Sequence, residues 1–309
     1  MSYQWKAGEG IADGFRRIAG EELDSAVDGL AHPEVRGVEA TVHDVRKRCK
    51  KVRGLARLVR PGLAKATFRE INQAARDAAA EISSIRDAHA LLASFDRLLA
   101  NDADGVPISG IFAVRAELSR RAHEATQAVA GQHDQVQRAL EGLDALRATV
   151  AEADVEDDLD VLIDGVTTTY RLGGAAMHAA VGGEDDEAFH EWRKREKDLW
   201  YAVRLISPAA PAVLDPTAKL LHVLSEDLGD DHDLAVLTDL VGVDPEACGG
   251  AAAAEAAATL AAERRVALQH HAAGLGVQVY AEKPKAFARR LRAYWKAWER
   301  AGHDLPGGT

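Results

Sequence analysis

Two segments of the sequence carry histidine, arginine and lysine at a spacing that would place them together on one face of a helix. The first basic stripe consists of His43, Arg46, Lys47, Lys50 and Arg57. The second basic stripe consists of His190, Arg193, Lys194, Lys197 and Arg204. At about 100° per residue, each set falls within an arc of about 100°. Arginine binds phosphate oxygens in pairs and lysine supplies a mobile point charge, so each stripe predicts a binding site for a polyanion.

The opposite face of each segment is apolar, as in a helix that packs into a bundle. In the first segment this face contains Val42, Val45, Cys49, Val52, Ala56 and Val59. In the second it contains Phe189, Trp192, Leu199, Val203 and Ile206. Arg48 and Arg195 lie about 100° away from the stripes. We therefore expect charge reversal at these two arginines to weaken polyanion binding far less than reversal at Lys47 and Lys194.

The basic stripes belong to a chain that is acidic overall. The 309 residues carry a net charge of −11, yet ten Lys or Arg and no Asp or Glu lie between Val45 and Arg69, which leaves −21 for the remainder. Stacked like charges repel by about 0.2–0.5 kcal/mol per pair in an isolated helix. The repulsion is present in both basic stripes, and a bound polyanion that neutralises it is the simplest explanation. His43 and His190 begin the stripes, and protonation of such histidines would add a cation near pH 6–7 by their usual pKa.

The two stripes are part of an internal repeat. The segment 43–50 aligns with 190–197 at an offset of 147 residues, and the segment 82–87 aligns with 228–233 at an offset of 146. Two matched blocks at nearly one offset predict a duplicated helical unit. A divide near residue 155 separates the halves, so the expected units are 1–154 and 155–309.

The composition predicts an all-α protein, because Ala, Leu, Arg and Glu dominate and strand-type alternation is scarce. We expect helices at 9–30, 34–59, 64–99, 108–129, 132–153, 159–181, 184–206, 216–240, 251–274 and 283–301. Prolines and glycines lie mostly between these segments, where they end helices. The acidic stretch 152–164 reads as a solvated connection and the first turn of the next helix, because it lacks the ligand spacing and turn glycine of an EF-hand.

With these motifs, the sequence resembles the CHAD domain, the conserved histidine α-helical domain. The pattern His-x-x-Arg-Lys-x-x-Lys-x-x-x-x-x-x-Arg occurs twice and is joined by Arg86-Asp87 and by Leu228-Gly229-x-x-His232-Asp233. The closing segment 286–295 also resembles the last helix of that family. The resemblance covers about residues 9–300, without a CYTH-like β-rich segment, so it implies a stand-alone member.

The resemblance implies a fold and a function. The fold would be a pair of four-helix bundles related by a pseudo-twofold axis, with a basic groove between them that binds inorganic polyphosphate. Family members localise to polyphosphate granules or accompany CYTH-type triphosphatases. The implied binding residues are the two basic stripes, with Arg86 and His232 as further candidates. Ser83 stands where the second copy has Gly229, and Arg86 stands where it has His232.

Two other functions remain open on the sequence. Nucleic acid would also be attracted to the stripes, but they lack interleaved aromatic residues for stacking single strands, and the acidic remainder would repel a long duplex. A metal-dependent phosphohydrolase could use His232 and Asp233 with His190 and Asp87, although the neighbouring cations disfavour a metal ion. We expect binding without catalysis, no cofactor and no resident metal.

The expected compartment is the cytoplasm. Only two cysteines are present, Cys49 and Cys248, and they are far apart. Such sparse use of cysteine is typical of a reducing compartment. No run of eighteen apolar residues occurs, so no membrane span is expected.

Overall fold

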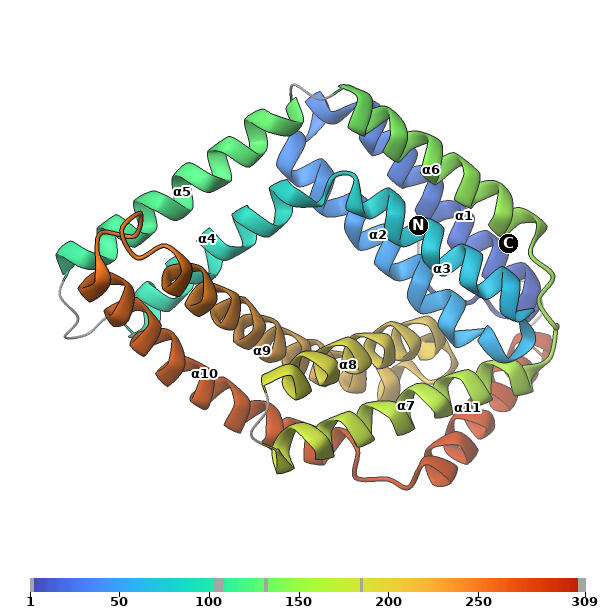
Figure 1. Ribbon diagram of the computed structural model, residues 1–309. Helices are drawn as coiled ribbons and strands as arrows, with labels where there is room; N and C mark the ends of the chain where they lie inside the picture. Colours follow the sequence, from blue (N-terminus) through green and yellow to red (C-terminus); the bar gives the residue numbers. More distant parts are fainter. Residues whose placement is uncertain (1–2, 103–107, 131–132, 184–185, 305–309) are drawn as a thin grey trace.

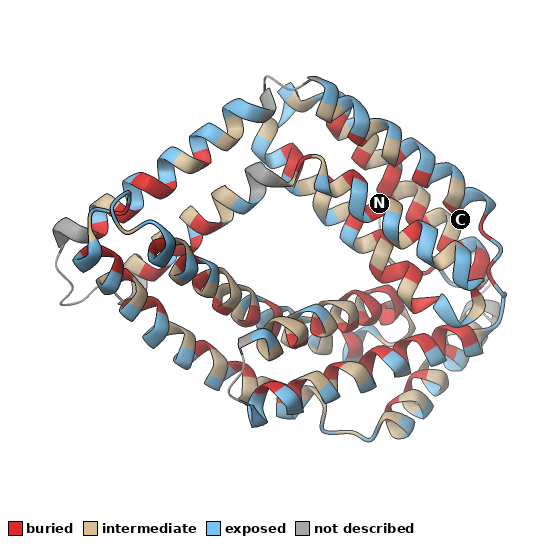
Figure 2. Cartoon of the chain, in the orientation of Figure 1, coloured by how far each residue is buried: buried red, intermediate tan, exposed pale blue. Residues whose placement is uncertain are grey.

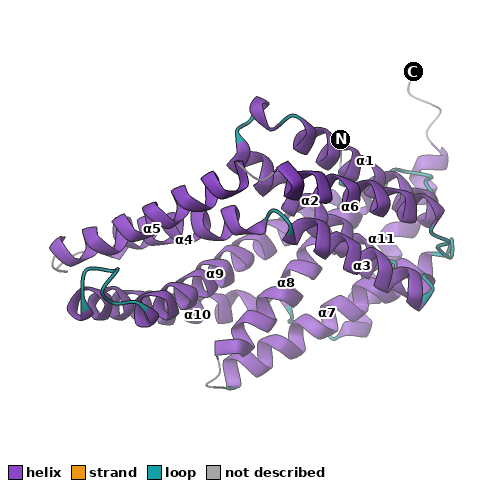
Figure 3. Ribbon diagram, turned by 45° about the horizontal axis from the view of Figure 1, so that its top comes forward, coloured by secondary structure: helices purple, strands orange, loops and turns teal. Residues whose placement is uncertain are grey.

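The computed structural model describes residues 3–102, 108–130, 133–183 and 186–304, and within these ranges the chain is almost entirely helical (Figure 1). The α-helices are α1 (Ile11–Ala31), α2 (Val38–Leu58), α3 (Lys65–Ala80), α4 (Ser83–Asp102), α5 (Ile108–Ala130), α6 (His133–Glu152), α7 (Leu159–Gly182), α8 (Asp186–Ile206), α9 (Pro211–Val243), α10 (Ala251–Val279) and α11 (Pro284–Asp304). Short 3₁₀ turns η1 (Pro33–Val35), η2 (Arg60–Gly62) and η3 (Ser207–Ala209) lie between them. The prediction of an all-α fold is confirmed (Figure 3).

Several predicted boundaries are wrong, among them the end of α10, which extends to Val279 rather than to residue 274. The segment 64–99, expected as one helix, is interrupted between α3 and α4. Ile82 turns into the core there, and the Ser83 hydroxyl donates to the carbonyl of Ala80 at 3.0 Å, a local bond that competes with helix continuation. In contrast, α9 begins at Pro211 rather than at the expected Pro216, which lies inside the helix.

The helices pack as two neighbouring groups. In the first group, α1, α2, α3 and α6 contact one another, and in the second α8 contacts both α7 and α9 while α10 packs along α9. The α4–α5 hairpin leaves the first group and packs on α9 and α10 (Figure 1). Buried residues line the inward faces of the helices (Figure 2). No helix in the described part is long and apolar enough to cross a membrane.

Helices α2 and α8, which carry the basic stripes, touch each other directly. Their apolar faces are buried as predicted, with Val45 and Val52 of α2 and Trp192 and Val203 of α8 inaccessible to solvent. The contact between the two helices needs a glycine. A Cβ atom at Gly54 would lie 3.2 Å from the Cβ of Tyr201, which is tighter than an ordinary contact, so Tyr201 or the helix would have to shift.

Candidate functional site

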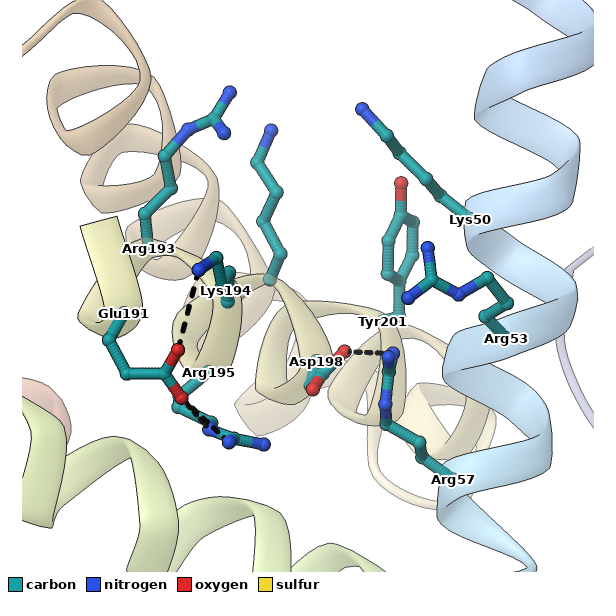
Figure 4. Close-up of a pocket in the computed structure, with 10 residues that line it drawn as sticks. Lys50, Arg53, Arg57, Glu191, Arg193, Lys194, Arg195, Asp198 and Tyr201 are labelled. Atoms are coloured by element: carbon teal, nitrogen blue, oxygen red, sulfur yellow. Dashed lines mark hydrogen bonds and ion pairs between the residues drawn. The ribbon is translucent and has the colours of Figure 1, made fainter. Parts of the chain in front are cut away.

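The contact between α2 and α8 encloses a basic pocket of about 250 Å³. We call it the α2/α8 pocket, and Figure 4 shows side chains from the two helices converging on it. Its lining consists of Lys50, Arg53, Arg57, Glu191, Arg193, Lys194, Arg195, Lys197, Asp198 and Tyr201. Seven of these ten residues are lysine or arginine and two are acidic. The excess of cations suits the pocket to an anion.

The pocket collects five of the predicted stripe residues. Lys50 and Arg57 come from α2, and Arg193, Lys194 and Lys197 come from α8. Arg204, the last member of the second stripe, is not among the lining residues. Its guanidinium lies over the rings of Trp200, at 4.9 Å, and Tyr3, at 5.7 Å, which is a packing position.

The amino-terminal part of the first stripe lies outside this pocket. His43 lines a second cavity farther toward the start of α2. Arg46 pairs with Asp87 at 3.0 Å, and Lys47 is exposed to solvent. Arg86 belongs to α4, but its side chain lies outside the described residues.

Two histidines lie beside Arg193. The rings of His190 and His232 stack with their centroids 4.1 Å apart, which joins α8 to α9. Burial and the charge of Arg193 lower the pKa of His232 to about 4. Burial and the charge of Lys194 lower the pKa of His190 below its ordinary value. The shift works against the charge that the sequence predicts for His190 near pH 6–7, since burial and the neighbouring cations favour its neutral ring.

Arg53 lines the pocket but does not belong to either predicted stripe. Its position is Trp200 in the second copy, so a search for residues shared by the repeats passes over it. Helical spacing could have found it, since it follows Arg46 by seven residues and Lys50 by three. Burial and the neighbouring Arg57 lower the pKa of Arg53 to about 10, and its Nε donates to Asn72 at 3.0 Å.

The two arginines expected to lie off the stripes behave differently from each other. Arg195 lines the α2/α8 pocket and also pairs with Glu191 at 2.6 Å. Arg48 lies in an internal network, where it bonds to the buried Glu22 at 2.9 Å and to Asp44 at 2.8 Å. Reversing the charge of Arg48 would place a carboxylate against Glu22 and Asp44, with only Lys51 left paired to Glu22, and would damage the fold. This pair of arginines is therefore not a suitable control.

Arg193 and Lys197 lie one turn apart on α8, and both line the pocket. In the described part of the chain no carboxylate forms an ion pair with either of them, although most of the arginines there do have one. The Nε atom of Arg193 is buried and has no hydrogen-bond partner. Burial, together with the charge of Arg193, lowers the pKa of Lys197. Both groups would gain favourable interactions from a bound anion.

The pocket also contains an ion pair that spans the two helices. Arg57 of α2 donates to Asp198 of α8 at 2.7 Å (Figure 4). Burial raises the pKa of Asp198, although the charge of Arg57 opposes this effect. The pair holds α2 and α8 together where their like charges would otherwise push them apart.

A buried carboxyl group lies behind the pocket on α8. Glu196 is fully buried, and neither of its carboxyl oxygens has a hydrogen-bond partner in the described part of the chain. The Ser225 hydroxyl is near but does not reach hydrogen-bond geometry, and burial raises the pKa of Glu196 well above 4.5. Burial thus disfavours a negative charge on Glu196 beside Arg193 and Lys197.

The four proposed metal ligands do not come together as one group, although the rings of His190 and His232 stack. Asp233 accepts a hydrogen bond from the Ser94 hydroxyl at 3.1 Å, and Asp87 is paired with Arg46. Across the described residues, no group of three or more His, Cys, Asp or Glu side chains is placed to hold a metal ion.

Comparison with known proteins agrees with this architecture. The model of the CHAD domain family matches residues 22–242. No curated protein matches the chain. The chain is similar to the crystal structure of the CHAD domain from the plant Ricinus communis, with 18% sequence identity and a TM-score of 0.52 over 99% of this chain and 96% of that one. At that identity the likeness shows the fold alone. Because the family model covers well over half of the sequence, the chain belongs to the CHAD domain family.

Proposed function

We propose that this protein binds inorganic polyphosphate in the α2/α8 pocket and does not convert it. The observation that carries the proposal is the pair of cations Arg193, whose Nε atom is buried without a hydrogen-bond partner, and Lys197, which is largely buried; no carboxylate of the described residues forms an ion pair with either. Keeping such charges away from water costs free energy unless an anion compensates them. Membership of the CHAD family is consistent with a polyphosphate ligand.

The shape of the pocket favours a thin polyanion over nucleic acid. A cavity of about 250 Å³ between two helices has room for a few phosphate groups but not for a duplex. Tyr201, its aromatic lining residue, is buried and packs against Gly54 and Tyr3, so it offers no free face to a base. Stacking on exposed aromatic rings is the usual means of binding single strands.

We also infer that the fold is a duplicated unit with a pseudo-twofold axis. The repeat equates α2 with α8 and α4 with α9, and the chain order then equates α5 with α10. In the structure each of these helices contacts its own equivalent. Contacts between equivalent elements are what a twofold relation produces at its axis, and they support division of the chain near residue 155.

A salt-series titration tests the proposed ligand. Long-chain polyphosphate is titrated into the protein with tRNA and duplex DNA as competitors, while released phosphate is measured with and without Mn²⁺. We expect binding that prefers polyphosphate, weakens steeply with salt and releases no phosphate. Phosphate release would instead support the phosphohydrolase function. Equal affinity for the three polymers would mean that the site is a generic basic surface without preference for polyphosphate.

The stacked histidines predict that binding takes up protons. The pKa of His190 and that of His232 lie below the ordinary value in the free protein, and a nearby polyanion favours the charged ring, so both should rise on binding. Affinity should therefore increase as the pH falls from about 7 toward 5, within the ordinary titration range of histidine. Calorimetry in two buffers of different ionisation enthalpy measures the uptake. If the double variant His190→Asn/His232→Asn takes up as many protons as the parent, this explanation is wrong.

Association with polyphosphate granules and with a CYTH-type triphosphatase is proposed on the family resemblance alone. The binding residues that we propose are those of the α2/α8 pocket. His43, Arg46, Lys47 and Arg86 would extend the path along α2 and α4, on the first half of the repeat.

A further inference from the structure

A second and larger cavity, of about 760 Å³, lies where α2, α4, α5 and α9 meet. We call it the α2/α4/α5 cavity, after the three helices that supply most of its lining. Its residues come from the first turns of α2, the middle of α4 and the last third of α5. Apart from His43, the polyphosphate proposal uses none of them.

Three lining residues of this cavity form a continuous polar chain. Glu39 of α2 places its Oε2 atom 3.3 Å from Nδ1 of His89, which belongs to α4. The Nε2 atom of the same ring lies 2.9 Å from Oγ1 of Thr126, which belongs to α5. A carboxylate, an imidazole and a hydroxyl in this order form the arrangement by which enzymes activate a hydroxyl nucleophile.

The order of the contacts suggests a role for each group. The Glu39 carboxylate beside Nδ1 favours the tautomer of His89 with its hydrogen on that atom. In this tautomer the Nε2 atom carries the free lone pair that can accept the hydroxyl proton of Thr126. The Thr126 hydroxyl also reaches the carbonyl of Ala122 at 3.0 Å, so rotation about its C–O bond exchanges these two acceptors. The three side chains thus supply a nucleophile (Thr126), a base (His89) and a group that orients the base (Glu39).

The same cavity offers groups for the rest of a substrate. The first turn of α2 lines it, and the preceding Gly37 provides no side-chain cap, so backbone N–H groups there are available to an oxyanion. Val38 and Ala93 contribute apolar side chains to the lining of the cavity. Arg97 also lines the cavity, but it is engaged with Asp230 at 2.6 Å.

From this geometry we propose that the α2/α4/α5 cavity hydrolyses small carboxylic esters through Thr126. The Thr126 oxygen bonds to the ester carbonyl carbon while His89 takes its proton. The carbon–oxygen bond to the alcohol then breaks, and the alcohol leaves with that proton. Water attacks the acyl-threonine with His89 again as base, which releases the carboxylic acid and restores the hydroxyl. No oxidant, reductant or metal is needed.

Ester hydrolysis by matched variants tests the proposal. The probes are p-nitrophenyl acetate and p-nitrophenyl butyrate, and the readout is saturable release of p-nitrophenolate. We expect Thr126→Val and His89→Gln each to lower kcat/KM about 100-fold, the scale of a lost acid–base group. Thr126→Ser should retain activity. Thr217→Val is the control, because the Thr217 hydroxyl is exposed and likewise donates to a carbonyl four residues back, at 2.9 Å.

Covalent labelling provides the second readout. A fluorophosphonate should add to the parent protein at Thr126, as located by peptide mass spectrometry, and should not label the folded Thr126→Val variant. Saturable hydrolysis that survives Thr126→Val overturns the proposal, as does a folded parent that shows neither hydrolysis nor an adduct. Polyphosphate affinity is measured on the same variants and should not change for Thr126→Val. Failure of the ester-hydrolysis proposal would therefore not contradict the proposed polyphosphate site.

Discussion

The double variant Arg193→Met/Lys197→Met is expected to bind polyphosphate more than a hundredfold more weakly than the parent protein. Each cation would make at least one charge-assisted hydrogen bond to phosphate, and two such bonds contribute about 3 kcal/mol or more. Methionine keeps the apolar stem that packs in the pocket. Because the two charges repel each other and no carboxylate among the described residues pairs with them, the variant should be at least as stable as the parent.

The control for this experiment removes the same charge elsewhere. Arg115 and Arg138 are partly exposed arginines that pair with Asp96 at 2.7 Å and Glu81 at 3.0 Å, and neither lines the α2/α8 pocket. Affinity is measured by titration at fixed salt, and unfolding by urea. Equal loss of affinity in Arg115→Met/Arg138→Met would show that net charge, and not the pocket, determines binding.

The second large effect concerns stability. Replacement of Glu196 by glutamine should make the protein more stable above about pH 5, by an amount that grows with pH. The pKa of Glu196 is raised well above 4.5 in the folded state, so the folded protein keeps a proton that the unfolded chain releases. The parent therefore loses up to about 1.4 kcal/mol of unfolding free energy per pH unit as the pH rises from 4.5 toward the folded pKa. Glutamine cannot ionise and avoids this loss.

The effect is measured as the free energy of unfolding in urea for both proteins, between about pH 4.5 and pH 8. Linkage predicts that the two free energies diverge over this range. The curves of unfolding free energy against pH for the parent and Glu196→Gln should meet near pH 4.5 and separate above it. Glu255→Gln serves as the control, since Glu255 is an exposed glutamate of α10. Parallel curves for the parent and Glu196→Gln would mean that Glu196 is ionised in the fold, with a counter-charge that the described contacts do not contain.

Periodicity in the sequence was sufficient to predict much of this molecule. A 3.6-residue repeat of apolar side chains located α2 and α8, because burying that face is what stabilises an amphipathic helix. Identity between the repeats then selected Lys50, Arg57, Arg193, Lys194 and Lys197, which the structure gathers into one pocket. The break before α4 was not predicted, since it depends on burial of Ile82 and on the bond from Ser83 to Ala80.

Residues outside the repeat could not be assigned in the same way. Arg53 and Trp200 occupy equivalent positions, so the pocket is asymmetric although the motif is duplicated. Arg204 keeps its identity but stacks on Trp200 instead of entering the pocket. Glu39, His89 and Thr126 are separated by 50 and 37 residues. Their proximity arises from packing of three helices, which no local pattern in the sequence encodes.

The ion pair between Arg57 and Asp198 has a consequence for how quickly a ligand is captured. It joins α2 to α8 through the protein's own residues, so we expect the pocket to be assembled before an encounter. Capture then requires no rearrangement of the two halves, and the association rate constant should be set by diffusion and electrostatic attraction, falling with ionic strength. Asp198→Asn would loosen this connection, and its signature would be slower association even though the pocket had lost a negative charge.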